Sequence, residues 1–430
     1  MDKFIIEGLH PLSGEVTPAG NKNSALPLMA ACLLTDQPVT LHNIPDIRDV
    51  HIMKSLLETL GTKITILSPH SWQFHAKNLD AAKLDRDQLK EIRASILLAG
   101  PMTARIGDLS LYPPGGDVIG RRRVDTHILA LKALGAEAAY ENEKKLFHFT
   151  APNGLTGADI LLDETSVTAT ENAIMAAVLA KGETILRNSA SEPHVQELCN
   201  MLNILGAKIS NIGSNTLVIE GVTSLSGGEF TIGPDYLEVV SYIGAAIMTK
   251  GSLRIKNAGS NYLDMVRLVF KRMGIEWKTD GEDIVVPKEQ SLDIEPDLGN
   301  AIPEIKVMPW PSFPPDLMSI AIVVATQCHG SILFHDWMYN SRMFFTDKLV
   351  SMGAQIVLCD PHRVIVQGPS KLLGENLESP DIRAGMSLVL AALGAKGTSV
   401  IGNINQIDRG YEKVQEKLQA LGANIERVSE

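Results

Sequence analysis

One acid stands in a loop-forming stretch that leads directly into a block of cations. The stretch reads Tyr-Pro-Pro-Gly-Gly-Asp-Val-Ile-Gly, residues 112–120, and Asp117 is its only charged residue. Arg121, Arg122 and Arg123 follow it. Guanidinium groups bind phosphate and carboxylate through paired hydrogen bonds, and a run of arginines after a glycine-rich loop favours phosphate binding over a solvated patch. The spacing fits neither a Walker loop nor a dinucleotide fingerprint.

Other polar residues stand at the first positions of segments that are otherwise apolar. They are Lys22 and Asn23, Arg93, the run from Ser166 to Thr170, Asp316, and Arg383 with Asp381 two residues before it. Arg342 and Arg409 are further isolated cations. A cation at a helix N-terminus opposes the helix dipole, so the repeated placement of cations there indicates an anionic ligand.

The composition excludes several classes of protein. A formal net charge of -11 argues against broad nucleic-acid binding, which needs a basic face. The most apolar run, which begins at Leu317, is too short to span a bilayer, and the first residues lack a signal-peptide pattern. The four cysteines have no metal-like spacing and are expected to be reduced thiols of a cytoplasmic protein. No metal site is predicted.

The elements that must position these residues recur six times. An amphipathic helix followed by glycine, as in Leu-Leu-Glu-Thr-Leu-Gly, repeats at intervals of roughly 70 residues. The glycines are Gly61, Gly135, Gly206, Gly274, Gly353 and Gly422, and each fits the left-handed position after a helix. A helix of small and apolar residues lies about half a repeat before each one. The first module, which starts at the strand Gly-Glu-Val-Thr of residues 14–17, reads βαβαββ.

Helices that are apolar on every side need a shared interior. Three modules per domain would let three such helices form one core with sheets around it, which predicts two domains. The Gly- and Ser-rich segment 221–235 is the expected boundary. An open solenoid of six modules is the alternative, and it is disfavoured because a closed core suits all-apolar helices better.

The chain resembles the enolpyruvyl transferases, and among them the UDP-N-acetylglucosamine 1-carboxyvinyltransferases. The resemblance covers nearly the whole chain and rests on several motifs: Asn-Lys-Asn-Ser-Ala-Leu-Pro, Pro-Pro-Gly-Gly-Asp-Val-Ile-Gly, Arg-Arg-Arg-Val-Asp-Thr-His, Phe-Pro-Pro-Asp-Leu and Ser-Pro-Asp-Ile-Arg-Ala-Gly-Met. It implies two inside-out α/β barrel domains, each of three βαβαββ units. Residues 21–231 would form one domain, residues 1–20 and 232–430 the other, and the active site would lie in the cleft between them.

The resemblance implies a reaction without a cofactor or metal. Enolpyruvyl would pass from phosphoenolpyruvate to the 3′-hydroxyl of UDP-N-acetylglucosamine by addition and elimination, with release of phosphate, as the first committed step of peptidoglycan synthesis. The implied contacts to phosphoenolpyruvate are Lys22, Arg122 and Arg409. Those to the sugar are Asn23 and Asp316, the latter as general base. Those to uridine and diphosphate are Arg93, Arg122, Arg123, Val124, Asp125, Thr126, Ser166, Val167 and Thr168. Met338 would contact the nucleotide sugar through its backbone, and Arg342, Asp381 and Arg383 would assist closure.

The resemblance also assigns a role to Asp117. Many members of the family have a reactive cysteine at this position, and a subset has Asp. The implied role is general acid at the enol methylene. A free Asp has a pKa near ~3.9, which loop closure over anions would raise and nearby arginines would lower. The family inhibitor fosfomycin alkylates the cysteine, so a chain with Asp117 is expected to resist it.

Two departures leave the acceptor open. Glu164 stands where many members have lysine near the diphosphate, and Arg123 replaces a common proline. The extra arginines would compensate for that lysine, or the nucleotide sugar differs. The alternatives are a paralogue acting on another UDP- or UMP-linked acceptor, the sister transferase of the shikimate pathway, whose Asn-Ala-Gly-Thr signature is absent, and a non-catalytic repeat scaffold.

Overall fold

The computed structural model describes residues 2–84, 86–116 and 123–429, which form two compact units. The described part of one, the central unit, lies within Gly20–Gly233. The other, the terminal unit, joins the N-terminal residues up to Ala19 to the chain from Pro234 onwards. The chain therefore changes unit at residues 19–20 and 233–234, against the expected 20–21 and 231–232.

Each unit contains three sheets. Those of the central unit have the orders β13-β3-β5-β4, β6-β8-β7 and β11-β12-β10-β9. Their strands are β3 (Val39–His42), β4 (Lys63–Ser68), β5 (Ser71–His75), β6 (Asp108–Leu111), β7 (Glu137–Glu141), β8 (Leu146–Thr150), β9 (Asp159–Leu161), β10 (Glu183–Arg187), β11 (Lys208–Ser210), β12 (Thr216–Glu220) and β13 (Gly228–Thr231).

The sheets of the terminal unit have the orders β15-β16-β14-β2, β17-β18-β20-β19 and β21-β22-β1-β23. Their strands are β1 (Lys3–Glu7), β2 (Ser13–Val16), β14 (Ser252–Ile255), β15 (Lys278–Asp280), β16 (Asp283–Val286), β17 (Glu304–Lys306), β18 (Gly330–His335), β19 (Gln355–Asp360), β20 (Arg363–Gly368), β21 (Asn376–Glu378), β22 (Thr398–Gly402) and β23 (Asn424–Val428).

The predicted βαβαββ module is complete between Asp159 and Glu220. It runs β9, α6 (Val167–Ala177), β10, α7 (Pro193–Ile204), β11, β12. Strands β9 and β10 are parallel, and β12 pairs antiparallel with both β10 and β11. The parallel pair needs a crossover helix, whereas the last two strands need only a hairpin. The sequence periodicity therefore identified the repeating unit correctly.

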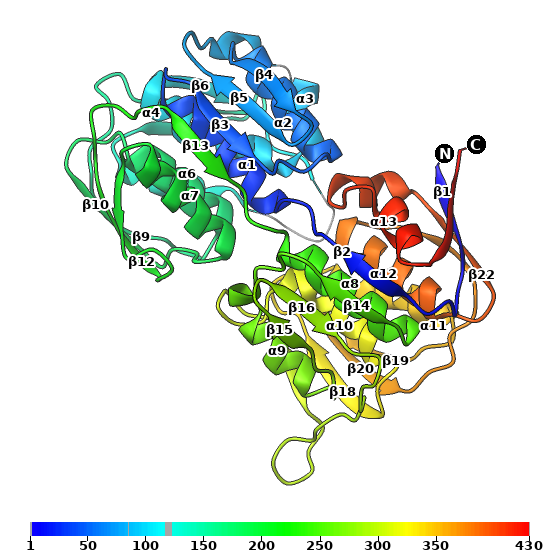
Figure 1. The fold of residues 1–430 in the computed structure, drawn as a ribbon. Coiled ribbons are helices and arrows are strands. Elements are labelled where there is room, and N and C mark those ends of the chain that lie inside the picture. The colour runs from blue at the N-terminus through cyan, green and yellow to red at the C-terminus, as the bar shows by residue number, and fades with distance from the viewer. Residues whose placement is uncertain (1, 85, 117–122, 430) are drawn as a thin grey trace. The chain divides into compact units, whose positions relative to one another are not determined.

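The first module differs from its sequence interpretation. Strand β2, expected to begin that module, pairs in parallel with β14 of the terminal unit. Its expected place beside β3 is taken by β13, which follows the third module (Figure 1). Segment 221–235 is therefore not a simple linker, because it contains a strand of the central unit. Repeat spacing could not reveal this exchange, since β2 and β13 each occupy an equivalent edge position.

The helices fall into the two predicted kinds. Those that run through the two interiors are α1 (Lys22–Ala31), α4 (Ala99–Arg105), α6, α8 (Tyr236–Thr249), α10 (Met318–Ala325) and α12 (Ile382–Gly394). Those with a polar face are α2 (Arg48–Thr59), α5 (Asp125–Ala133), α7, α9 (Asp264–Lys271), α11 (Thr346–Ser351) and α13 (Val414–Ala420), and a short helix α3 spans Arg86–Glu91.

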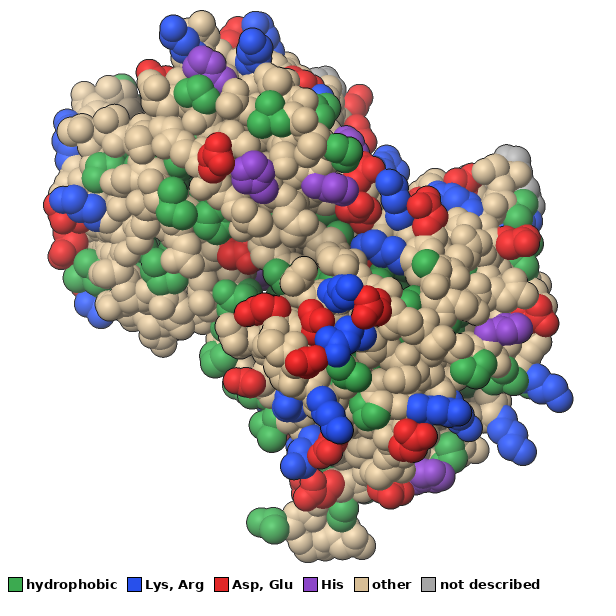
Figure 2. All heavy atoms as spheres, in the orientation of Figure 1, with side chains coloured by type: hydrophobic (Ala, Val, Ile, Leu, Met, Phe, Trp, Pro, Cys, Tyr) green, Lys and Arg blue, Asp and Glu red, His purple; other side chains and the backbone are tan. Residues whose placement is uncertain are grey.

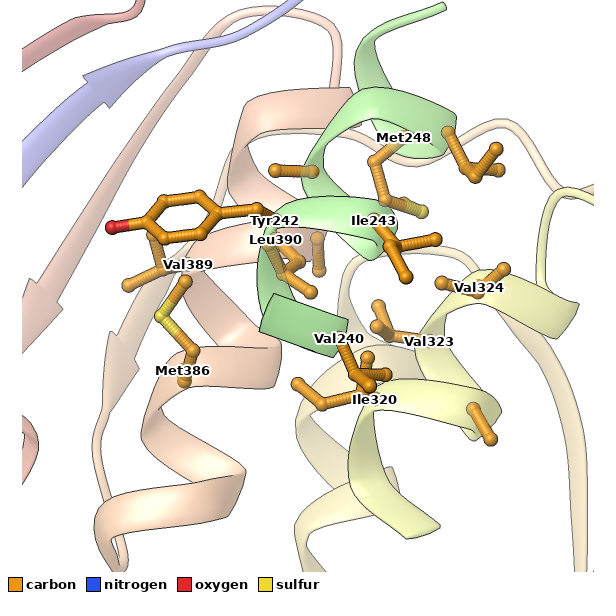
Figure 3. Close-up of a cluster of buried hydrophobic side chains, with 14 of the residues drawn as sticks. Val240, Tyr242, Ile243, Met248, Ile320, Val323, Val324, Met386, Val389 and Leu390 are labelled. Carbon is orange, nitrogen blue, oxygen red and sulfur yellow. The ribbon is translucent and has the colours of Figure 1, made fainter. Parts of the chain in front are cut away.

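In the terminal unit, α8, α10 and α12 pack against one another, and Figure 3 shows the apolar side chains that they share. Every residue of α8 is buried. Gly244 lies at the crossing, where a Cβ atom would come within 2.8 Å of Leu390 and 3.2 Å of Ile320. A small residue here lets the three helices approach closely. The central unit has its own apolar core, so each domain is stabilised by burial of its own helices.

The six repeated glycines behave as predicted. All have positive φ, from 70° at Gly274 to 102° at Gly206. Five stand directly after the residue that ends the amphipathic helix, and Gly274 stands one residue further on. A left-handed residue turns the chain out of the helix and into the following strand, and glycine adopts that conformation without steric cost.

The surface carries both signs of charge. On the face shown in Figure 2, lysine and arginine side chains are interspersed with aspartate and glutamate.

Among the described residues, no helix combines the length and the apolar character needed to cross a membrane.

Candidate active site

Lys22 and Asn23 are the first two residues of α1. The side chain of Asn21 caps the helix by accepting hydrogen bonds from the backbone N–H groups of Asn23 and Ser24. The Nζ atom of Lys22 lies 2.7 Å from Oδ2 of Asp49, in the first turn of α2, and both side chains are buried. A buried ammonium group needs such a partner. Asp49 was not predicted from the sequence, because a lone acid in the first turn of a helix carries no distinctive signal.

Arg93 begins a 3-10 turn, Arg93–Leu98, rather than the α-helix expected from its apolar neighbours; the regular helix α4 starts at Ala99. Its Nη2 atom donates to the carbonyl oxygen of Arg123 at 2.9 Å. Arg93 is therefore tied to the segment for which the family resemblance implies nucleotide binding.

Residues 123–126 are held by two carboxylates. Arg123 lies 3.0 Å from Asp125 and 3.3 Å from Asp163, and the Thr126 hydroxyl donates to Asp163 at 2.6 Å. The hydrogen bond that Arg123 donates to Asp125 is the main cause that raises the pKa of Arg123. Asp163, which the sequence analysis missed, thus links α5 to the segment before α6. Val124 is the residue that precedes α5.

The glycines before Asp117 are explained by packing. A Cβ atom on Gly115 would lie 1.6 Å from the carbonyl oxygen of Lys90, and one on Gly116 would lie 2.8 Å from Cβ of Arg93. Gly116 also has a φ of 107°. This segment therefore passes close to the turn that carries Arg93. Asp117 and Arg122, both predicted site residues, lie outside the described residues.

Ser166 precedes α6, and Val167 and Thr168 are its first two residues. The Thr168 hydroxyl lies 3.2 Å from Nε2 of His127, a buried residue of α5. Burial, and to a smaller extent the charge of Arg93, lowers the pKa of His127 to about 3. Its imidazole is therefore neutral near pH 7. His127 was not a predicted site residue.

The low pKa of His127 predicts a pH-dependent contribution to stability. The unfolded chain binds a proton at His127 below about pH 6.5, whereas the folded chain does so only near pH 3. Burial of the neutral imidazole therefore carries no protonation penalty above pH 6.5. Below that pH the free energy of unfolding falls by ~1.4 kcal/mol per pH unit, because the unfolded chain gains the proton first. Urea unfolding of wild type and His127→Gln at pH 7, 6 and 5 should show their stability difference shifting by about 1 kcal/mol between pH 6 and 5 in favour of the variant. A constant difference would contradict this assignment.

In the terminal unit, Asp316 lies between two buried arginines. Nη2 of Arg342 donates to Oδ1 of Asp316 at 3.1 Å, and Nε of Arg383 lies 3.6 Å from its Oδ2. Asp316 lies in a 3-10 turn, Pro315–Leu317, just before α10, and Arg383 is in the first turn of α12. Arg342 begins a 3-10 turn, Arg342–Phe345, before α11. Two successive modules thus place their charged residues together, because Asp316 and Arg342 belong to the module from β17 to β20 and Arg383 to the next one.

Each arginine has further supports. Arg342 lies over the ring of Tyr339 at 4.7 Å and within 3.5 Å of the fully buried Asp336. Burial lowers the pKa of Arg342, but Asp316 and other acidic neighbours raise it more. Burial also raises the pKa of Asp336, and Arg342 opposes that shift. Asp336 was missed, although an acid inside Phe-His-Asp-Trp-Met was an available signal.

Arg383 lies over the ring of Tyr411, 5.5 Å from its centre. Burial lowers the pKa of Arg383, but Tyr411, Asp316 and Asp235 raise it by more, so the net shift is upward. Its Nη1 atom is buried and has no hydrogen-bond partner among the described residues. Such a buried donor is costly unless an acceptor binds there. Asp381 caps α12 by accepting from the backbone N–H groups of Arg383 and Ala384, so part of its role is structural.

Met338 and Arg409 complete the predicted set in this unit. The N–H of Met338 donates to Oδ1 of Asp336 at 2.9 Å, so a backbone contact to a ligand would use its carbonyl group. Arg409 ends a 3-10 turn, Ile404–Arg409, and its Nη1 donates to Gln406 at 3.0 Å.

The structure thus brings together Asp316, Arg342 and Arg383 in the terminal unit, and Arg93 with residues 123–126 in the central unit. No group of three or more potential ligands could hold a metal ion in the part of the chain that is described.

Residues 6–418 match the family model described as EPSP synthase (3-phosphoshikimate 1-carboxyvinyltransferase). The chain belongs to this enolpyruvyl transferase family. A protein of Bradyrhizobium diazoefficiens named UDP-N-acetylglucosamine 1-carboxyvinyltransferase is 54% identical, with 100% of this chain and 98% of the relative aligned. A protein of Treponema denticola with the same name is 51% identical, with 99% of each chain aligned.

Solved enolpyruvyl transferases share the fold. The crystal structure of NikO from Streptomyces tendae has a TM-score of 0.87 at 24% identity and covers 100% of this chain and 99% of that one. The EPSP synthase of Acinetobacter baumannii has a TM-score of 0.75 at 17% identity, with 100% of both chains covered. The two-domain α/β fold of the enolpyruvyl transferases, predicted from the sequence, is confirmed.

Proposed function

We propose that the protein transfers enolpyruvyl from phosphoenolpyruvate to the 3′-hydroxyl of UDP-N-acetylglucosamine and releases phosphate. This is the first committed step of peptidoglycan synthesis and takes place in the cytoplasm. The observation that carries the proposal is that relatives named UDP-N-acetylglucosamine 1-carboxyvinyltransferase share 51% to 54% of their residues with this chain over nearly its full length. Asp316 with Arg342 and Arg383 provides the chemical support, because this group combines a carboxylate with two cations.

In the addition step, Asp117 gives a proton to the methylene carbon of phosphoenolpyruvate. The neighbouring carbon becomes electrophilic and forms a bond to the 3′-oxygen of the sugar, whose proton passes to Asp316. Lys22, Arg122 and Arg409 hold the phosphate and carboxylate. In the elimination step, the tetrahedral adduct loses phosphate, and a proton from its methyl group returns to Asp117 as the double bond is restored.

The contacts of Asp316 suit a general base. Arg342 and Arg383 engage different carboxylate oxygens, which fixes the plane of the group. Each carboxylate oxygen can accept more than one hydrogen bond, so capacity remains for a substrate hydroxyl. The buried Nη1 donor of Arg383 is suited to an anionic part of the substrates.

Glu164 favours a second candidate, transfer to another UDP- or UMP-linked acceptor. Its side chain is exposed beside the segment that leads to α6, where a negative charge disfavours a diphosphate. Arg123, already paired with Asp125 and Asp163, has less capacity to offset that charge.

A phosphate-release assay tests both candidates. The protein would be incubated with phosphoenolpyruvate and, in turn, UDP-N-acetylglucosamine, UDP-glucose, a UMP-linked sugar and 3-phosphoshikimate. We expect release with UDP-N-acetylglucosamine and an enolpyruvyl ether as product. Release with a different acceptor alone would replace the first candidate, and release with none would indicate a non-catalytic scaffold.

A further inference from the structure

A buried asparagine of α6 has its orientation set by the backbone. Asn172 accepts a hydrogen bond from the N–H of Gly100 at 2.7 Å and donates one to the carbonyl of Ile96 at 2.8 Å. A backbone N–H can only donate, and a carbonyl can only accept. The oxygen and nitrogen of the Asn172 amide are therefore assigned by chemistry, without the usual ambiguity of a flipped amide. A Cβ atom on Gly100 would lie 2.8 Å from that oxygen, so the contact also requires glycine.

This orientation determines the tautomer of His127. The Nδ2 atom of Asn172 also lies 2.8 Å from Nδ1 of His127. An amide nitrogen carries two hydrogens and no acceptor, so Nδ1 must accept. In a neutral imidazole the proton is then on Nε2. His127 is buried, and burial together with Arg93 keeps its pKa near 3, so the neutral form prevails.

The tautomer in turn sets the polarity of Thr168. Its Oγ1 atom, 3.2 Å from Nε2 of His127, must accept the imidazole proton. The hydrogen of the hydroxyl is then directed away from His127. Thr170, on the same helix, contrasts with it: Thr170 donates to the carbonyl of Ser166 at 2.8 Å and accepts from the N–H of Ala190 at 2.9 Å. Thr170 is satisfied inside the protein, whereas Thr168 is partly exposed.

We propose that His127, held by Asn172, is a positioning residue that makes the Thr168 hydroxyl a hydrogen-bond donor to a diphosphate oxygen of the nucleotide sugar. The identity of this ligand rests on the proposed function. The diphosphate undergoes no bond change in the reaction. The contact should therefore stabilise the bound substrate and the transition state equally, and its loss should raise KM without lowering kcat.

The first experiment compares three variants. Thr168→Val keeps the shape of the side chain but removes the donor, and we expect KM for UDP-N-acetylglucosamine to rise about tenfold or more with kcat little changed. Thr168→Ser keeps the hydroxyl and should restore KM. Thr170→Val is the matched control, which should lower the unfolding midpoint and leave KM unchanged. An unchanged KM in Thr168→Val would overturn the proposal.

The second experiment asks whether His127 acts through Thr168. His127→Leu removes the imidazole donor, so KM should rise; His127→Gln, which retains a donating amide, should raise it less. The double variant His127→Leu, Thr168→Val should be no worse than Thr168→Val alone, because the two residues serve one contact. If the two substitutions raised KM additively, they would contradict the relay, that is, the action of His127 through the Thr168 hydroxyl. Imidazole ¹⁵N shifts of the wild type should report a proton on Nε2, and a proton on Nδ1 would contradict the tautomer assignment.

Binding measurements separate this proposal from the proposed function. Calorimetry with UDP and with uridine should show that Thr168→Val weakens UDP binding about tenfold or more and leaves uridine binding unchanged. If wild type binds UDP but transfers nothing to UDP-N-acetylglucosamine, the proposed acceptor is wrong and the relay can still be judged. If wild type binds UDP and Thr168→Val binds it equally well, the relay is wrong and the proposed function is unaffected.

Discussion

Replacement of Asp117 by Asn is expected to lower kcat by two to four orders of magnitude, the usual contribution of a general acid. Asparagine has nearly the same shape but cannot supply a proton to the enol methylene. The measurement is steady-state phosphate release with saturating phosphoenolpyruvate and acceptor. The control is Asp108→Asn. Asp108 is an exposed acid at the start of β6, nine residues before Asp117, and its replacement should keep normal turnover. Near-normal turnover in Asp117→Asn would refute the acid assignment.

The same position determines the response to fosfomycin. A carboxylate is a much weaker nucleophile than a thiolate, so the unmodified protein should keep its activity after prolonged incubation with the epoxide. Asp117→Cys should be active, since a thiol can also donate a proton, and should be inactivated irreversibly. Mass spectrometry would detect one added inhibitor on Asp117→Cys. The same covalent adduct on the unmodified chain would contradict the prediction.

Replacement of Asp316 by Asn is expected to cause the second large loss of kcat. Loss of the base at the sugar hydroxyl should lower kcat by about 10²–10⁴, measured by steady-state phosphate release. Stability should also fall, because Arg342 and Arg383 would keep only part of their neutralising charge.

Asp336→Asn separates the two effects of Asp316. Asp336 also pairs with Arg342 but is fully buried. Its replacement should destabilise the protein to a similar degree, measured by urea unfolding, while kcat falls much less than in Asp316→Asn. Equal losses of kcat in both variants would indicate that Asp316 acts only by holding the arginines.

Much of the architecture could be predicted because it depends on local patterns. The period of the apolar residues distinguishes buried from half-buried helices, and a glycine after each amphipathic helix marks where the chain turns. These features need only a few neighbouring residues, and the structure confirms them at all six repeats. The exchange of β2 and β13 was not visible in the repeat pattern, because partner choice between equivalent sheet edges depends on residues 189 positions apart for β13 with β3 and 239 positions apart for β2 with β14.

The candidate site divides in the same way. Isolated charges at the starts of apolar segments pointed to Lys22, Arg93, Asp316 and Arg383 because a charge there has no ordinary structural reason. Asp49, Asp163 and Asp336 look like common acids in the sequence. Only the fold pairs them with Lys22, Arg123 and Arg342, respectively.

The amino-acid sequence alone therefore determined the repeating unit, the helical cores, the family and the types of side chain available for chemistry, since each is written in composition and short-range spacing. The tertiary structure decided which acid neutralises which cation, why Gly115 and Gly116 must lack side chains, and which nitrogen of His127 bears its proton. Those properties depend on contacts between distant segments, and a hydrogen bond or ion pair exists only when folding brings both partners within a few ångströms.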